Sequence, residues 1–203
     1  RERHALFLDT RSLEIEHVPL DPDGDSLRLM VVDTRVHHSH GDGAYGDRRA
    51  ACERAARALD VGSLRELSSD GLDARLRALD VELARRVRHV VAENARVLQA
   101  VQHLRRRDWA RLGECLVASH VSLRDDYDVS CAELDVAVEA ALAGGALGSR
   151  MTGGGFGGSA VVLAPAIRVP DVRETVTRAF ADRGWADPGI AEVTPSAGAR
   201  RDD

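Results

Sequence analysis

A run of glycines constrains this chain more than any other feature of its sequence. Five of the six residues 153–158 are Gly, and an apolar run, 159–164, follows directly. Glycine loses more backbone entropy on folding than any other residue, so such a run stabilises neither a helix nor a strand. Its benefit is freedom in φ and the close approach of backbone N–H groups to a ligand, which is often an anion. The run therefore predicts a ligand-binding loop.

Two nucleotide-binding motifs and one structural alternative compete for this run. Its letters match Gly-x-Gly-x-x-Gly at Gly153, Gly155 and Gly158, but a dinucleotide fingerprint needs a helix after the loop, and the residues that follow are typical of a strand. A Walker A loop needs Gly-Lys-Ser/Thr, which is absent here. A hairpin connection without a ligand is the plainer interpretation, although a connector rarely needs so many glycines.

Apolar periodicity predicts an α+β domain. The expected strands are 5–9, 12–18, 27–33, 159–164 and 190–193. The expected helices are 44–59, 70–78, 79–101, 109–120, 131–143 and 171–183. Asp108 and Ser130 are expected to cap the helices that follow them. Because strands bracket a block of helices, a mainly antiparallel sheet is favoured.

Composition limits the partners that this chain can have. All 28 basic residues are Arg, they are interspersed with 33 acidic residues, and the net charge is −5, so a nucleic-acid partner is not favoured. The three cysteines are widely spaced and indicate neither a disulfide framework nor a zinc site. We expect no membrane span and no signal peptide, and therefore a cytoplasmic location.

Four stretches of the chain resemble galactokinases, a branch of the GHMP kinase superfamily. Residues 150–159, Arg-Met-Thr-Gly-Gly-Gly-Phe-Gly-Gly-Ser, resemble the third signature motif of GHMP kinases in its galactokinase form. Residues 33–53, which include Tyr-x-x-Arg-Arg-x-x-Cys-Glu from Tyr45, resemble a second galactokinase segment. Residues 86–96 and 119–135 resemble two more. The four stretches follow the family order and together span nearly the whole chain.

The resemblance implies the fold of the GHMP kinase C-terminal domain. That fold is α+β, with a mainly antiparallel, ferredoxin-like sheet and helices packed on one face. Residues 27–203 would form this domain, and residues 1–26 would be a remnant of the N-terminal domain. The sugar motif, the phosphate loop and the catalytic Asp of galactokinases have no counterpart in this sequence. We therefore expect the catalytic base upstream of Arg1, no catalytic residue within the chain, and the N-terminal domain as a missing partner.

For the intact enzyme, the resemblance implies transfer of the γ-phosphoryl group of ATP to the C1 hydroxyl of α-D-galactose, with Mg²⁺ at the phosphates. It gives Tyr45 a substrate-binding role, for which a half-buried structural tyrosine is the alternative. It also places a glycine loop beside the sugar and the transferred phosphoryl group. The residues of this loop are Gly153, Gly154, Gly155, Phe156, Gly157 and Gly158.

Two other functions stay open beside this one. A galactokinase-like regulatory protein could sense sugar without catalysis, and a GHMP kinase could act on another sugar, such as N-acetylgalactosamine. The isolated chain is expected to be inactive and to bind no cofactor tightly.

Several polar residues have a structural interpretation. A metal site is not favoured in the crowded loop that holds His37, His38, His40 and Asp42, and no metal ligand is assigned. His120 falls on the apolar face of its helix, so a buried structural role is expected. Arg48 and Arg49 are in reach of a phosphate, but ion pairing, for instance of Arg49 with Glu53 one turn later, is favoured.

Overall fold

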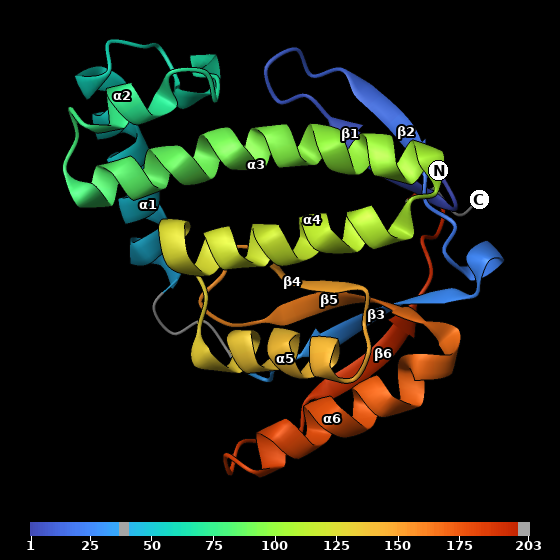
Figure 1. Ribbon diagram of the computed structural model, residues 1–203. Helices are drawn as coiled ribbons and strands as arrows, with labels where there is room; N and C mark the ends of the chain where they lie inside the picture. The colour runs from blue at the N-terminus through green and yellow to red at the C-terminus, as the bar shows by residue number, and fades with distance from the viewer. Residues whose placement is uncertain (37–40, 199–203) are drawn as a thin grey trace, which may run out of the picture.

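A four-stranded antiparallel sheet forms the centre of the molecule in the computed structural model, which describes residues 1–36 and 41–198 (Figure 1). The strand order is β4-β5-β3-β6. These strands are β3 (Leu27–Asp33), β4 (Gly148–Thr152), β5 (Ser159–Pro165) and β6 (Gly189–Val193). Strands β1 (His4–Leu8) and β2 (Ile15–Pro19) form a separate antiparallel hairpin. The predicted antiparallel α+β architecture is confirmed, but helices cover both faces of the sheet and not one face as predicted. The division into domains at residues 26 and 27 stays a prediction.

The described residues contain six α-helices and several shorter turns. The helices are α1 (Gly41–Ala58), α2 (Leu72–Leu76), α3 (Val81–Arg106), α4 (Trp109–Ser122), α5 (Ala132–Ala143) and α6 (Val169–Ala181). The short turns are η1 (Asp23–Asp25), η2 (Leu64–Glu66), η4 (Ala166–Arg168) and the π-helical η3 (Leu123–Tyr127), which continues α4. Within this part of the chain, no helix is both long and apolar enough to cross a bilayer.

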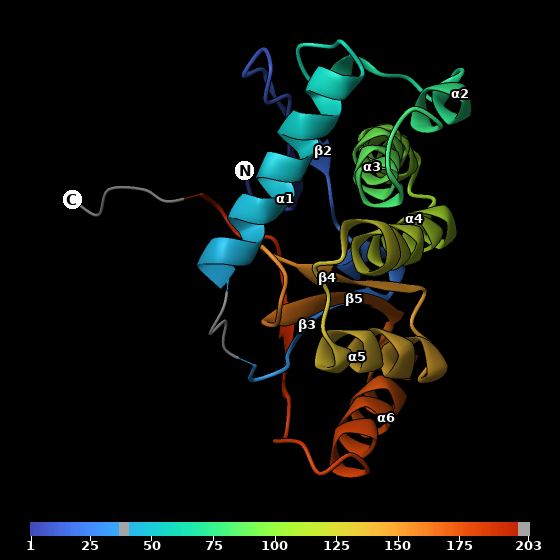
Figure 2. The same ribbon diagram turned by 90° about the vertical axis from the view of Figure 1, so that its left-hand side faces the viewer.

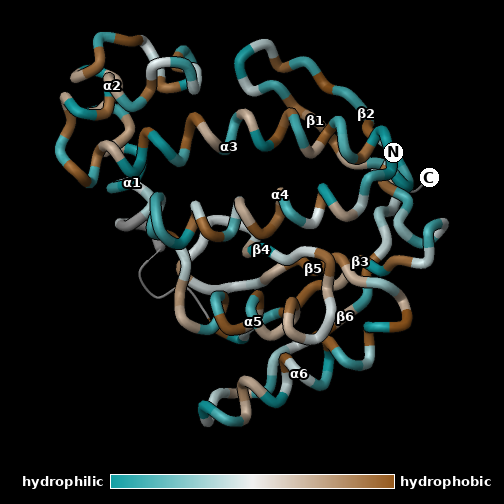
Figure 3. The backbone as a smooth tube through the Cα atoms, in the orientation of Figure 1, coloured by the Kyte–Doolittle hydropathy of each residue, from teal (hydrophilic) through white to brown (hydrophobic). Residues whose placement is uncertain are grey.

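The helices lie in layers about the sheet. Figure 2 shows the sheet nearly edge-on, with α4 on one side and α5 and α6 on the other. Apolar and polar positions alternate along α3 and α4 (Figure 3), as expected for helices that bury one face. Strand β4 lies against α4, where Gly113 and Gly148 bring the two backbones so close that a Cβ at either would lie within 2.4 Å of the other backbone.

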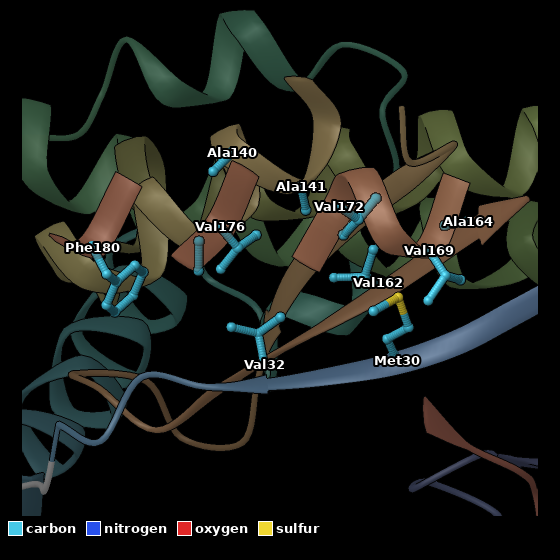
Figure 4. Close-up of a cluster of buried hydrophobic side chains, with 11 residues drawn as sticks. Met30, Val32, Ala140, Ala141, Val162, Ala164, Val169, Val172, Val176 and Phe180 are labelled. Carbon is cyan, nitrogen blue, oxygen red and sulfur yellow. The ribbon is translucent and has the colours of Figure 1, made fainter. Parts of the chain in front are cut away.

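The main core fills the space between the sheet and the helices α5 and α6 (Figure 4). Because side chains alternate along a strand, Met30 and Val32 of β3 point to the same face, and Val162 of β5 lies opposite Met30. Phe180 and its neighbours on α6 cover them. Each such side chain contributes about 1.5–3 kcal/mol to stability when it is fully buried. This core therefore stabilises the sheet whose strands β4 and β5 the glycine loop connects.

The hairpin β1–β2 buries one face and exposes the other. Ala5, Phe7 and Val18 pack with residues of α3. On the opposite face, Leu6 and Ile15 are 58% and 59% exposed, and Leu8 pairs across the hairpin with Ile15. Contiguous apolar surface of this kind favours association.

Removing this apolar surface is therefore expected to keep the isolated chain monomeric. The double substitution Leu8→Thr, Ile15→Thr should raise the protein concentration at which light scattering first detects aggregates. The control is Ile167→Thr, because Ile167 is 84% exposed but stands apart from the hairpin. Equal aggregation of the parent chain and the double variant would contradict this prediction.

Two local predictions are wrong for identifiable reasons. Helix α2 covers only Leu72–Leu76 of the expected 70–78, because Gly71 with φ of 69° precedes it and Asp80 already caps α3 by accepting from the Leu83 amide. Ser130 does not cap α5 either. Cys131 is the N-cap residue, and the Ser130 hydroxyl donates to Asp135 Oδ1 at 2.6 Å instead. The cap by Asp108 is confirmed, since its carboxylate accepts from the Arg111 amide at 3.2 Å.

Candidate functional site

The glycine loop, residues 153–158, connects β4 to β5 as a hairpin. The hairpin geometry of the plainer interpretation is thus present, but the backbone is unusual. All loop residues except Gly154 have positive φ, from 63° at Phe156 to 137° at Gly157. Residues other than glycine rarely adopt positive φ, so the backbone conformation of the loop itself requires most of the glycines.

The second half of the glycine loop is fixed from two sides. The Phe156 amide donates to Val129 O at 2.6 Å, and the Gly158 amide donates to Val36 O at 3.1 Å. The carbonyl of Gly158 accepts from the Thr34 amide at 2.9 Å and from the Thr34 hydroxyl at 2.7 Å. Residues 155–158 are therefore held in place between the end of β3 and the segment that follows η3.

The first half of the glycine loop is open. Gly153 and Gly154 are exposed, and a Cβ added to either would meet no atom within 4 Å. By contrast, a Cβ at Gly155 would lie 2.3 Å from Val129 O. Gly154 also lies outside the left-handed φ region. The described fold thus gives no steric reason for glycine at this position.

The helix that carries Tyr45 is held beside the glycine loop. Tyr45 lies near the N-terminal end of α1 and is 57% exposed in this chain. One turn later, the Arg48 guanidinium lies over the Phe156 ring, with 5.9 Å between its Cζ and the ring centroid. The structure therefore brings α1 to the loop, although the ligand contacts of Tyr45 and of the loop stay a prediction.

A polar cluster, partly buried, lies between α1, α3 and η3. The His89 ring stacks on Tyr127 with 4.4 Å between centroids, and its Nδ1 lies 3.0 Å from Ser122 Oγ. The Tyr127 hydroxyl lies 4.0 Å from Cys52 Sγ. Burial raises the pKa of Tyr127 to about 12 and also raises the pKa of the Cys52 thiol. Both groups thus stay protonated at neutral pH, which fits a structural role and not a basic one.

Buried histidines should make the stability of the chain depend on pH. Burial is the main cause that lowers the pKa of His89 and of His120 in the folded chain. Since the folded pKa lies below the unfolded one, near 6.5, the unfolded state binds more protons as the pH falls. The free energy of unfolding should therefore decrease between about pH 7 and pH 5. Denaturant titrations should show a weaker decrease of this free energy for His89→Gln than for the parent. His17→Gln should show the same decrease as the parent, since His17 is exposed. An unchanged slope in His89→Gln would contradict this.

Other candidate residues take structural positions. His120 is 2% exposed, its Nδ1 accepts from the Met151 amide at 3.3 Å, and its Nε2 lies 3.2 Å from Asp135 Oδ1, so the buried role is confirmed. The predicted ion pair is also confirmed, with 3.0 Å between Arg49 Nε and Glu53 Oε1. Of the crowded loop, His37, His38 and His40 lie outside the described residues, and Asp42 belongs to the first turn of α1.

Neither a cluster of metal ligands among the described residues nor the pocket beside α1 includes the glycine loop. Across residues 1–36 and 41–198, no three His, Cys, Asp or Glu side chains converge to hold a metal ion. A pocket of about 360 Å³ lies between α1, η2 and α3, and none of the residues that line it belongs to the glycine loop.

One family model and several curated proteins match this chain. The family model "GHMP kinases C terminal" matches residues 100–182. The galactokinase of Streptomyces coelicolor is 52% identical over 200 residues, which are 98% of this chain and 52% of that protein. The galactokinase of Bos taurus is 49% identical over 179 residues, which are 87% of this chain and 45% of that protein.

Solved structures agree with these relatives. The Lactococcus lactis galactokinase complexed with galactose superposes with a TM-score of 0.91 at 31% identity, over 98% of this chain and 52% of that one. The L. major mevalonate kinase, 22% identical with a TM-score of 0.53 over 96% of this chain and 50% of that one, shares the fold alone. The chain spans about half the length of the curated relatives that it matches. Residues 100–182 of this chain are therefore similar to the C-terminal domain of GHMP kinases, and nearly the whole chain is similar to about half of a galactokinase.

Proposed function

We propose that this chain serves as the C-terminal portion of a galactokinase, which phosphorylates α-D-galactose at C1 with ATP. The observation that carries the proposal is the open half of the glycine loop. Gly153 and Gly154 present bare backbone beside the helix of the exposed Tyr45, in a chain that is 52% identical to a galactokinase. Because ATP is the proposed phosphoryl donor, the proposal also assigns the protein to the cytoplasm.

The residues of this chain would bind and position the reactants. In phosphoryl transfer, catalysis rests on positioning and on stabilisation of charge. The amides of Gly153 and Gly154 suit the oxygens of a phosphoryl group, and the Tyr45 phenol can donate to and accept from a sugar hydroxyl. Mg²⁺, when bound, would neutralise phosphate charge. The described residues offer no cluster of ligands for it, so its ligands are assigned to the part of the relatives that this chain does not match.

Kinetics in a complete enzyme test the proposal. We define the galactokinase chimera as the Streptomyces coelicolor relative in which this chain replaces the matching 200 residues. The chimera should show galactose-dependent ATP turnover, whereas the isolated chain should show none. Tyr45→Phe in the chimera should raise the KM for galactose about tenfold, the loss of one hydrogen bond worth about 1.4 kcal/mol.

Three outcomes decide between the proposed and the open functions. A folded chimera without turnover would refute the proposal. If the chimera turns over N-acetylgalactosamine in preference to galactose, that sugar would replace galactose as the proposed substrate. Turnover by the isolated chain would show that the catalytic Asp and the phosphate loop expected upstream of Arg1 are not needed.

A further inference from the structure

The end of η3 is held by two arginines. Three consecutive backbone carbonyls there accept side-chain hydrogen bonds. Asp126 O accepts from Arg86 Nη1 at 2.6 Å, Tyr127 O accepts from Arg48 Nε at 2.9 Å, and Asp128 O accepts from Arg48 Nη2 at 2.8 Å. Helix ends leave such carbonyls without partners inside the helix. Here, helices α1 and α3 supply the partners from far along the chain.

The two arginines also share one carboxylate. Asp128 Oδ2 lies 2.8 Å from Arg48 Nη2 and 3.3 Å from Arg86 Nη2. The side chains of Arg86 and Arg48 are only 4% and 15% exposed, so their charges are costly to bury unless they are paired. Asp128 itself has φ of 56°, a conformation that is uncommon for a residue with a side chain. We call Arg48, Arg86 and Asp128 the arginine clamp.

The arginine clamp is connected to the glycine loop by direct contacts. Val129, the residue after Asp128, accepts the 2.6 Å hydrogen bond from the Phe156 amide, and the backbone of Gly155 lies against it. On the other side, the Arg48 guanidinium lies over the Phe156 ring. A displacement of residues 126–129 would therefore displace the fixed half of the loop, and the open half with it.

We propose that the arginine clamp positions the glycine loop for phosphoryl transfer. Its members act through Val129 and Phe156, so they are positioning residues and need not touch substrate. The inference rests on the proposed function, but the placement of the loop can be measured without it. Lysine cannot replace Arg48, because one ammonium group cannot reproduce the planar set of donors that bonds two carbonyls and a carboxylate.

Amide hydrogen exchange in the 203-residue chain tests the positioning directly. Arg48→Lys should increase the exchange rate of the Phe156 amide at least about tenfold, since local opening would no longer be opposed by the clamp. Asp128→Asn keeps the shape of the side chain and should increase the same rate about threefold. The matched control is Arg49→Lys, because Arg49 is the neighbour of Arg48 but is exposed and, among the described residues, pairs only with Glu53. Unchanged exchange of Phe156 in both clamp variants would overturn the inference. If Arg48→Lys does not fold, Asp128→Asn alone decides.

Kinetics of the galactokinase chimera test what the positioning does. Arg48→Lys should lower kcat about 10- to 100-fold while the KM for galactose changes less than about twofold, because misplacement of a positioning loop acts on the reacting geometry. Arg49→Lys should change neither constant. An unchanged kcat in Arg48→Lys, or a loss confined to KM, would overturn the inference. An inactive parent chimera would refute the proposed function, and the exchange of Phe156 would still decide on the clamp.

Discussion

Gly154→Ala is expected to lower kcat/KM of the galactokinase chimera at least about 100-fold without lowering its melting temperature. The added methyl group meets no atom within 4 Å and the backbone lies outside the left-handed region, so the fold accepts it. Alanine at such a site even tends to stabilise a protein, by about 0.4–1 kcal/mol. A methyl group between the loop and a phosphoryl group, however, would hold the ligand away from the amides, and loss of one such donor costs about 100- to 1,000-fold in rate.

Gly198→Ala is the matched control for this prediction. Gly198 is exposed, and a Cβ there also meets nothing within 4 Å, but it lies far along the chain from the glycine loop. This variant should change neither the kinetics nor the melting temperature. Wild-type kcat/KM in Gly154→Ala would contradict the ligand role of the loop. A clear fall in its melting temperature would contradict the open environment of Gly154.

Gly155→Ala should have the opposite profile and destabilise the chain itself. Its Cβ would lie 2.3 Å from Val129 O and 2.8 Å from Val129 Cβ, and its φ is 90°. The left-handed conformation costs about 1–2 kcal/mol for a residue with a side chain, and forced shifts of packed atoms cost about 1–3 kcal/mol more. We expect a loss of about 3 kcal/mol, equivalent to a melting temperature lower by about 6–12 °C.

Calorimetry or thermal circular dichroism of the 203-residue chain measures this effect, with Gly154→Ala as the comparison one residue away. A Gly155→Ala chain that melts within a degree or so of the parent would show that the contact between the loop and Val129 is not maintained. The glycine loop would then lack the fixed half on which the open half depends.

The sequence predicts elements well where a single period controls them. The apolar run 27–33 forms β3 with the expected bounds, because β5 and β6 pair with both of its edges and Met30 and Val32 are buried in the main core. Strand β4 was not predicted, since Gly148 and Ser149 carry no strand pattern. Its place depends on the close approach of α4 at Gly113, which is a tertiary contact. Helix α2 is shorter than the expected helix 70–78 for a local reason, because flanking turn residues and not helix propensity set its ends.

The sequence likewise predicts one part of the candidate site and misses another. The run of glycines identifies the loop without any structure, and the resemblance to galactokinases adds Tyr45. Neither separates Gly154, where the fold accepts a side chain, from Gly155, where Val129 excludes one. The arginine clamp was likewise hidden, because Arg86 reads as one of many charged residues on a long helix. Its burial becomes visible only when η3 packs against α3.

The most direct test of the central claim is the chemical shift of the glycine-loop amides in the galactokinase chimera when galactose 1-phosphate, the proposed product, is added. The account predicts saturable shifts at Gly153 and Gly154, since both residues are exposed, and none at Gly198. Saturating ligand that leaves the amides of Gly153 and Gly154 unshifted would contradict it.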